Sequence, residues 1–488
     1  MRSQLSCAAL ALCAACALAQ DSGDFVPAAE LERTRASLDW SSQLRKQAGQ
    51  LARLAGMKTL APSSTGTLRL GVVLVEFPDQ ARPAFSEPKH WADAFFSQGS
   101  YAKTATGEAA YGSLRDFYLE NSGGKLDVQG QVFDWVQVPT TRASLAEQLL
   151  VTPGVRNQLF SAAVDAVLAR DGEAALDGCD ALVFVCAGPS RLEGSSVPRG
   201  SILWPHSTLF MHKGKPWRYY TIESGLKWFE PIGVHCHELG HVLGIYDKYG
   251  LGDGTGMGQW CLMASGAHGP RAGRPLDREL ESPPETLRRL AEDQLKQGEA
   301  WLRRILRPRE GGAPGDLLVP KAPDQRPRTG TDLPFHFCAV CKVRLGWSQP
   351  ITIDPRSGHA AYLTPVEDDP NQVLRVLLDP RGRESLFLEY RAARGFDRRL
   401  HKGGLVVWRV GSPGAFLRTF VLLEAVELIP AHGLDTTDAA LRDPDTIPFP
   451  LGDTQQVTVR GKRRGAWSVT LSQIEERDGR LYLRISTE

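Results

Sequence analysis

The sequence predicts an α+β domain followed by a domain built mainly of β-strands. Three observations support this prediction. Helices and strands alternate over residues 67–186, and a long helix carrying an H-E-x-x-H spacing follows within residues 233–250 (GVHCHELGHVLGIYDKYG). From residue 349 to residue 488, short strands are separated by Gly, Pro and Asp turns, the pattern of a β-sandwich-like domain.

The first 19 residues have the features of a signal peptide. Arg2 precedes an apolar, alanine-rich run over residues 5–18, and Ala17-Leu18-Ala19 has the A-x-A pattern of a signal-peptidase site. This run is too short to anchor the chain permanently in a bilayer, and no later stretch is long and apolar enough. We therefore expect a secreted, extracellular protein without a membrane span. A periplasmic protein or a lipid-anchored one is the alternative.

Residues 20–66 form an N-terminal helical segment. The helix is predicted over residues 28–54, and the linker APSSTG at residues 61–66 follows it. In an exported protein such a segment could be a pro-segment that is removed. It could equally be an ordinary N-terminal helix of the mature domain.

The next elements are predicted from runs of apolar residues and the turn residues between them. A buried strand covers residues 68–77 and a helix covers 113–121. A strand over 126–132, a helix over 145–169 and a buried strand over 181–186 follow. These elements lead into the histidine-bearing helix, and together they predict a catalytic domain over residues 67–348.

That helix carries the spacing of a zinc hydrolase. His237 and His241 are four residues apart, so they lie on one face of a helix and can both bind one metal ion, while Glu238 beside them can reach a water held on the metal. Gly244 can end the helix in a backbone conformation that other residues resist, and the returning chain can bring Asp247 to the metal as a third ligand. The apolar residues around the motif favour a buried active-site helix of a zincin-like domain.

Residues 260–266 (WCLMASG) predict a Met-turn beneath the metal site. Met263 follows Asp247 by sixteen residues and stands next to Ser265-Gly266, so its side chain can supply an apolar floor. His268, just after this turn, is a candidate for stabilising the oxyanion, although an isolated loop histidine is more often a plain surface residue.

Residues 273–330 are predicted to be a charged insertion with a helix over 283–306 and a solvated loop after it. In the β-rich domain over residues 349–488, Asp368-Asp369 and Asp443-Pro-Asp445 could bind calcium, or they could simply be turn residues. The formal net charge is +1, which gives no reason to expect a nucleic-acid partner. We expect a monomer whose partner is a protein or peptide substrate.

Six cysteines remain once the signal peptide is removed. An even number in an exported chain is compatible with disulfides, but the pairing is open. Cys338 and Cys341 have the C-x-x-C spacing, for which a local disulfide or plain core packing is the favoured interpretation. Cys236 lies on another side of the helix from the histidine pair and is predicted to be a packing or disulfide residue. The six are Cys179, Cys186, Cys236, Cys261, Cys338 and Cys341.

Several stretches together resemble the immune inhibitor A family of secreted bacterial metallopeptidases. The resemblance runs in order from about residue 68 to the C-terminus. The matching stretches are VVLVEFPD at 72–79, SLRDFYLENSGGKLDVQGQV at 113–132, IGVHCHELGHVLGIYD at 232–247, WCLMASG at 260–266, CKVRLGW at 341–347, LFLEYRAARGFD at 386–397 and GGLVVWRV at 403–410.

The resemblance implies a zinc-dependent endopeptidase. One catalytic Zn²⁺ would be bound by His237, His241 and Asp247, Glu238 would be the catalytic base, and Ca²⁺ could bind as well. The chain departs from the family at residues 408–411, where WRVG replaces a WHVD-like segment, and at the charged insertion. The expected reaction is hydrolysis of a peptide bond by a zinc-held water activated by Glu238.

Two rival hypotheses stay open. The third ligand could be a downstream glutamate, Glu279 or Glu281, in place of Asp247. The chain could also be a catalytically silent zinc-containing adhesin or binding module, although the intact Glu238 argues against it.

Overall fold

The computed structural model describes most of the chain between residues 61 and 487. The described residues are 25–28, 31, 61–145, 153–189, 203–248, 257–269, 280–281, 319–320, 333–400, 402–411, 425–431 and 447–487. The chain divides into two compact units. The first unit comprises residues 57–338, and the second comprises residues 1–56 with 339–488. The predicted signal peptide lies outside the described residues, as do Asp443-Pro-Asp445 and nearly all of the N-terminal helical segment and the charged insertion.

A five-stranded sheet forms the centre of the first unit, in the order β3-β2-β4-β6-β5. Four of its strands are parallel, and only β5 runs antiparallel, at one edge. The strands are β2 (Gly66–Glu76), β3 (Leu126–Gln137), β4 (Ala181–Cys186), β5 (His206–His212) and β6 (Lys215–Glu223). All six residues of β4 are buried, as expected for a parallel strand covered on both faces.

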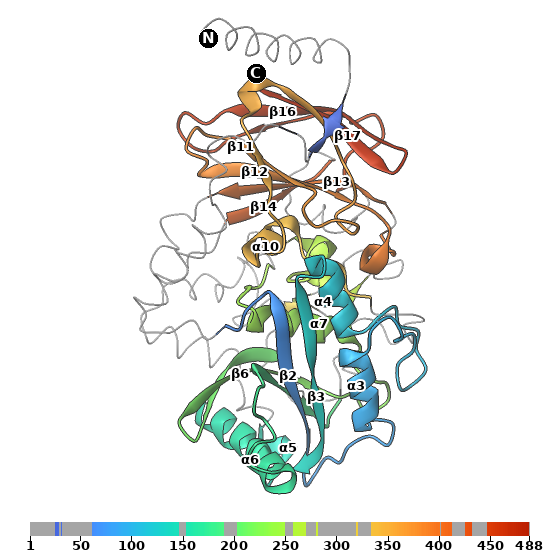
Figure 1. Cartoon of the computed structure of the whole chain (residues 1–488), viewed down its shortest axis with the longest axis vertical. Coiled ribbons are helices and arrows are strands. Elements are labelled where there is room, and N and C mark those ends of the chain that lie inside the picture. Colours follow the sequence, from blue (N-terminus) through green and yellow to red (C-terminus); the bar gives the residue numbers. More distant parts are fainter. Residues whose placement is uncertain are drawn as a thin grey trace, which may run out of the picture. The chain divides into compact units, whose positions relative to one another are not determined.

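Helices cover both faces of this sheet (Figure 1). On one face, α6 packs its apolar side chains against alternate residues of β2 and β4, such as Val73 and Phe184. The opposite face holds α7, because the hydroxyl of Tyr220 in β6 lies 3.3 Å from His235 of α7. Helices α3 and α4 pack with α7 on this face, through Phe95 against His235 and through Tyr118, whose hydroxyl donates to the carbonyl of Cys236. The helices are α3 (Pro88–Phe96), α4 (Leu114–Ser122), α5 (Arg142–Leu145), α6 (Pro153–Asp171) and α7 (Ile232–Val242), with 3-10 turns η4 (Gly258–Trp260) and η5 (Ser265–His268).

The strand predicted over residues 181–186 coincides with β4, and the helix predicted over 113–121 is displaced by one residue from α4. The predicted strand over 126–132 continues to Gln137 in β3. The helix predicted over 145–169 is found as α5 and α6, with residues 146–152 outside the described part. Within the charged insertion, β7 (Leu280–Glu281) and β8 (Val319–Pro320) form a small antiparallel pair.

The second unit contains two five-stranded sheets that share one hydrophobic core. Figure 1 shows β16 and β17 of one sheet in a layer apart from β12, β13 and β14 of the other. One sheet has the order β1-β10-β17-β16-β15 and the other β14-β13-β12-β11-β9. The strands are β1 (Val26–Pro27), β9 (Ile351–Ile353), β10 (His359–Leu363), β11 (Val373–Leu377), β12 (Glu384–Arg391), β13 (Gly404–Gly411), β14 (Ala425–Ile429), β15 (Val457–Arg460), β16 (Ser468–Arg477) and β17 (Arg480–Thr487); α10 (Ala339–Arg344) and 3-10 turns η6 (Pro355–Ser357) and η7 (Gly395–Asp397) complete it.

A buried ionic cluster joins two of the family-like stretches in the second unit. Arg391, at the end of β12, is fully buried and pairs with Glu367 at 3.3 Å and with Asp397. The indole nitrogen of Trp408 in β13 donates a hydrogen bond of 2.7 Å to Glu389 of β12. A buried guanidinium is tolerated only when carboxylates surround it, so these residue types must occur together.

The carboxylates of Asp368 and Asp369 are bound to protein groups. Asp368 pairs with Arg394 at 2.5 Å, and Asp369 accepts hydrogen bonds from Asn371 and Gln372. These contacts are typical of turn residues, and the calcium hypothesis stays a prediction.

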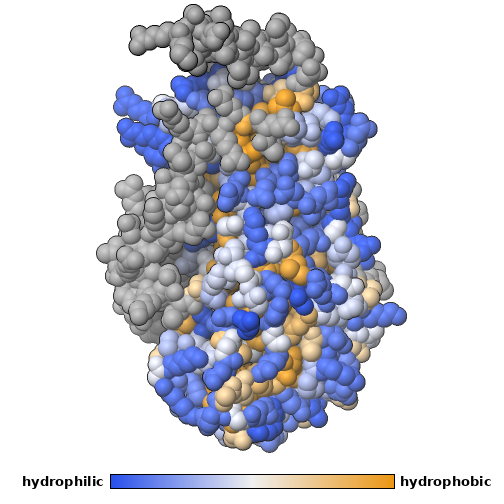
Figure 2. Space-filling model, viewed as in Figure 1, coloured by the Kyte–Doolittle hydropathy of each residue, from blue (hydrophilic) through white to orange (hydrophobic). Residues whose placement is uncertain are grey.

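The mixture of α and β structure predicted from the sequence is confirmed. The predicted domain limits and the zincin-like and β-sandwich-like descriptions stay predictions. Among the described helices, none has the length and apolarity needed to span a membrane. Figure 2 shows hydrophilic residues over much of the visible face, with hydrophobic patches between them.

Candidate metal centre

Helix α7 carries the H-E-x-x-H motif on a buried stretch of chain. His237 and Glu238 are each only 5% exposed, which places them inside the first unit rather than on a solvated face. The neighbouring His235 points elsewhere, into an aromatic pocket formed by Trp91, Phe95 and Tyr220. Burial lowers the pKa of His235 to about 3. His235 is therefore a neutral core residue, distinct from the two motif histidines.

The end of α7 turns the chain back toward the histidines. Gly244 has a φ of +90°, a conformation that side chains disfavour, and its N–H donates to the carbonyl of His241 at 2.9 Å. The N–H of Ile245 donates to the carbonyl of Gly240 at 3.0 Å. These two bonds form a Schellman motif, in which a residue in the left-handed conformation ends the helix. The predicted role of Gly244 is therefore found in the structure, and it brings Asp247 back beside α7.

Three donor atoms converge beside the helix. One carboxylate oxygen of Asp247, Oδ1, lies 3.0 Å from Nε2 of His237 and 3.3 Å from Nε2 of His241. A carboxylate oxygen of Glu238 lies within 4.8 Å of a ring nitrogen of each histidine. The side chain of Asp247 is 53% exposed, so this group of residues is open to solvent on one side. All four residues predicted from the sequence are thus brought together.

Backbone carbonyls hold both imidazole rings from behind. Nδ1 of His237 lies 3.0 Å from the carbonyl oxygen of Leu262, and Nδ1 of His241 lies 2.7 Å from that of Ile245. Because a carbonyl only accepts, each Nδ1 must carry the hydrogen and donate it. In a neutral ring this leaves the lone pair on Nε2, which is the arrangement that metal-binding histidines need. Sequence reasoning could not find these acceptors, since any residue supplies a carbonyl.

The ionised carboxylate of Asp247 between His237 and His241 favours the binding of a cation. Burial lowers the pKa of His241, but the hydrogen bond and the charge of Asp247 outweigh burial and raise that pKa to about 9. Burial raises the pKa of Asp247, and hydrogen bonds from His237 and His241 overcome it and hold that pKa well below its usual range. The carboxylate thus stays ionised between two imidazoles. It accepts from Nε2 when that nitrogen carries a proton, and a metal ion that binds here would replace the proton. Two imidazole nitrogens and one carboxylate oxygen are a donor set that suits Zn²⁺, so the residues present fit this ion.

Met263 lies directly beneath α7. A Cβ at Gly240 would stand 2.5 Å from the Met263 sulfur, so the helix and the methionine pack without an intervening side chain. The N–H of Lys248, next to Asp247, donates to the carbonyl of Met263 at 2.7 Å. The predicted Met-turn segment therefore contacts both the helix and the chain that carries the third donor. His268 is partly buried at the end of η5, and its role in oxyanion stabilisation stays a prediction.

Helix α4 supports the site from outside. The Tyr118 hydroxyl donates to the carbonyl of Cys236 on α7 at 2.7 Å. Glu120 lies 2.7 Å from Nε2 of the buried His336, and the carbonyl of His336 accepts the N–H of Leu262 at 2.9 Å. Since Leu262 is the residue that holds His237, a chain of hydrogen bonds runs from α4 to a candidate metal ligand. Nothing in the sequence marks Tyr118, Glu120 or His336 for this role.

The side chains of Glu279 and Glu281, the alternative third ligands, are not among the described parts of the structure. Glu279 lies outside the described residues, and only the backbone of Glu281 is described, in β7. The convergence of Asp247 on both histidines nonetheless favours Asp247.

Known proteins match the part of the chain that contains these four residues. The model of the immune inhibitor A peptidase M6 catalytic domain matches residues 69–176 and 214–281, and the second segment contains all four site residues. These segments are similar to the catalytic domain of the immune inhibitor A peptidase M6 family. The resemblance predicted from the sequence is confirmed, and it supports a metallopeptidase.

One relative is the pre-pro-metalloprotease PrtV of Vibrio cholerae serotype O1, in strains M66-2 and ATCC 39315 / El Tor Inaba N16961. Each is 26% identical to this chain over 235 residues, which covers 38% of the chain and 24% of the relative. The match spans about a quarter of the length of these curated relatives.

Proposed function

We propose that this protein is a secreted zinc-dependent endopeptidase. His237, His241 and Asp247 bind one Zn²⁺, and Glu238 is the catalytic base. The observation that carries the proposal is the approach of Asp247 Oδ1 to within 3.3 Å of both Nε2 atoms, with a Glu238 oxygen within 4.8 Å of the ring nitrogens. The M6 family match over the same residues supports it independently.

When bound, zinc supplies Lewis-acid chemistry for the hydrolysis of an amide. Glu238 takes a proton from the attacking water and passes it to the nitrogen of the leaving amine, as a general base and then a general acid. The carbonyls of Leu262 and Ile245 keep the imidazoles in one tautomer and one orientation throughout. The apolar sulfur of Met263 fixes the floor on which α7 rests.

The substrate class is a protein or peptide. The site lies open on the side of Asp247, which suits a chain that must enter in extended form and be cut internally. We also propose a zincin-like catalytic fold for the first unit, whose sheet has one antiparallel edge strand, β5, on an otherwise parallel sheet.

The direct test measures metal content and casein hydrolysis in the wild type and in two variants, Glu238→Gln and Asp247→Ala. We expect about one zinc per chain, cleavage that a chelator abolishes, and a Glu238→Gln variant that keeps the zinc and loses cleavage by on the order of a hundredfold or more. Asp247→Ala should lose both.

Arg356→Ala is a matched control. This residue lies in η6 of the second unit, where it pairs with Asp354 and packs over the Trp467 ring, so its substitution should leave zinc content and cleavage unchanged. An enzyme without zinc, or one in which Glu238→Gln cleaves casein normally, would refute the proposal. Zinc without any cleavage in the wild type would favour the binding-module hypothesis.

A further inference from the structure

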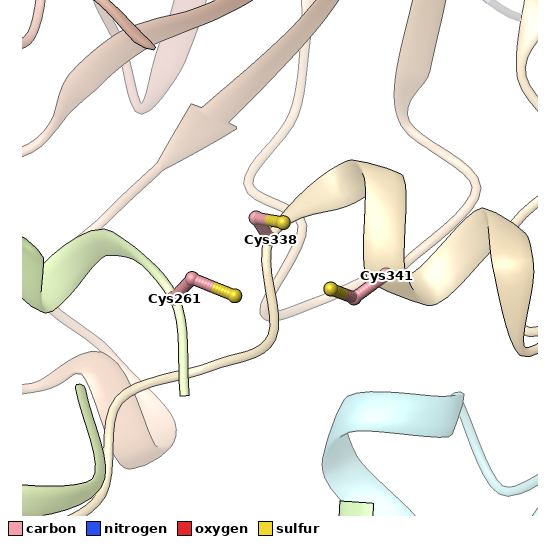
Figure 3. Close-up of side chains that lie close together, drawn as sticks. All are labelled: Cys261, Cys338 and Cys341. Atoms are coloured by element: carbon pink, nitrogen blue, oxygen red, sulfur yellow. The ribbon is translucent and has the colours of Figure 1, made fainter. Parts of the chain in front are cut away.

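Two buried cysteines of the first unit lie close together next to the Met-turn. Cys261 directly precedes Leu262, and Cys338 is the last residue of the first unit. Both side chains are fully buried, and their sulfur atoms lie within 4.8 Å of one another. Figure 3 shows this pair together with Cys341, which follows three residues further on, in α10.

The backbones that carry the two cysteines are already paired. The N–H of Leu262 donates to the carbonyl of His336 at 2.9 Å, and the N–H of Phe335 donates to the carbonyl of Gly266 at 2.9 Å. These two hydrogen bonds hold the two segments side by side. The sulfur atoms already lie within 4.8 Å of one another, so rotation of the two side chains can bring them toward the S–S bond length of about 2.0 Å.

We propose that Cys261 and Cys338 form a disulfide in the mature protein, a modification that rests on the proposed export to an oxidising compartment. The S–S bond forms as each thiol gives up its proton and the pair gives up two electrons. The oxidant is a disulfide-bearing exchange partner, which is reduced to two thiols. Because both thiols are buried in the folded unit, the exchange takes place while the chain folds. The finished bond is then shielded from external reductants.

The disulfide would stabilise the position of a candidate metal ligand. It joins the residue before Leu262 to the segment whose His336 carbonyl holds Leu262, and Leu262 in turn holds Nδ1 of His237. One covalent bond thus links the segment that carries Leu262 to the segment that carries His336. We expect its loss to speed the release of zinc to a chelator by on the order of tenfold, the usual scale for groups that orient a metal-binding histidine.

Peptide mapping of the exported, full-length protein tests the proposal without relying on its activity. The protein is denatured with iodoacetamide and without reductant, and is then digested with trypsin. We expect a linked pair consisting of residues 249–271, with Cys261, and residues 329–342, with Cys338 and Cys341. Trypsin leaves the last two cysteines on one peptide, so Cys341→Ser serves as the matched control. The linked pair should persist in Cys341→Ser and disappear in Cys338→Ser.

Four results would overturn the proposal. The first is full alkylation of Cys261 and Cys338 in the unreduced exported protein. The second is a bond within residues 329–342, between Cys338 and Cys341. The third is a linked pair that persists in Cys338→Ser and disappears in Cys341→Ser. The fourth is a second zinc per chain whose removal exposes these thiols, which would make the cysteines metal ligands. An inactive protein that still contains the linked pair would contradict the proposed function and leave the disulfide standing.

Discussion

Gly240 and Met263 lie in direct contact between helix α7 and the predicted Met-turn. A Cβ at Gly240 would come within 2.5 Å of the Met263 sulfur and 3.3 Å of the Phe337 ring. Met263 and Phe337 are both fully buried, so neither has free space into which it can move. Gly240→Ala should therefore lower the free energy of unfolding by about 1–3 kcal/mol, the usual result of overpacking a core. The loss should appear although alanine has the higher helix propensity. Urea unfolding of the two proteins measures it.

Gly154→Ala is the control for this prediction. Gly154 lies in the first turn of α6, where an added Cβ would meet nothing within 4 Å. The substitution should be neutral or should raise the free energy of unfolding by up to about 1 kcal/mol. Equal effects of the two substitutions would show that close packing at Gly240 is not the cause.

The pair formed by Glu120 and His336 gives a second prediction. Glu120→Ala removes one hydrogen-bond partner of a fully buried imidazole, which should lower the free energy of unfolding by about 1–3 kcal/mol. Since His336 holds Leu262 only through its backbone carbonyl, the affinity for zinc should fall less than about tenfold. Glu120→Gln keeps a hydrogen-bonding side chain and should recover most of the stability. If Glu120→Ala removed zinc binding entirely, Glu120 would have a more direct role than the structure assigns to it.

The candidate metal centre was largely predictable from the sequence because its donors lie on one short stretch of chain. The spacing of His237 and His241 and the glycine after them determine where Asp247 can arrive, and no distant element is needed. The groups that hold the imidazoles are different. They are the backbone carbonyls of Leu262 and Ile245, and a carbonyl leaves no trace in the choice of side chain.

In the fold, too, some elements could be predicted from the sequence and others could not. The strand β4 is a continuous apolar run and was predicted with its true limits. The hairpin of β5 and β6 was missed, because polar residues interrupt its strands. Its turn did carry a signal at Lys213-Gly214, where both residues have positive φ as in a two-residue hairpin turn.

The partly buried His206 predicts a contribution to stability that depends on pH. Burial lowers its pKa to about 4, although a hydrogen bond to the carbonyl of Trp204 acts in the opposite direction. In the unfolded chain the histidine titrates near 6.5, so between pH 6.5 and pH 4 the unfolded state binds more protons than the folded state. The contribution of His206 is thus complete above pH 6.5 and is lost as the pH falls to 4. It amounts to at most about 3 kcal/mol.

The measurement compares the wild type with His206→Gln, because many carboxylates also titrate in this range. The free energy of unfolding should fall less steeply from pH 6.5 to pH 4.5 in the variant. Parallel curves would mean that His206 is protonated as easily in the folded protein as in the unfolded chain.

The stabilisation of the folded protein by added zinc should differ between variants of the proposed metal ligands and a variant of the proposed base, Glu238. A ligand present at a hundred times its dissociation constant raises the free energy of unfolding by about 2.7 kcal/mol when it binds only the folded state. Wild type and Glu238→Gln should both gain this increment when zinc is added to the metal-free protein, because Glu238 is not a ligand. His241→Ala should gain much less, since one of the three converging donors is missing. Thermal unfolding at fixed free zinc measures all three proteins. If Glu238→Gln also lost the increment, Glu238 would have to bind the metal directly, and the assignment of Asp247 as the third ligand would fail.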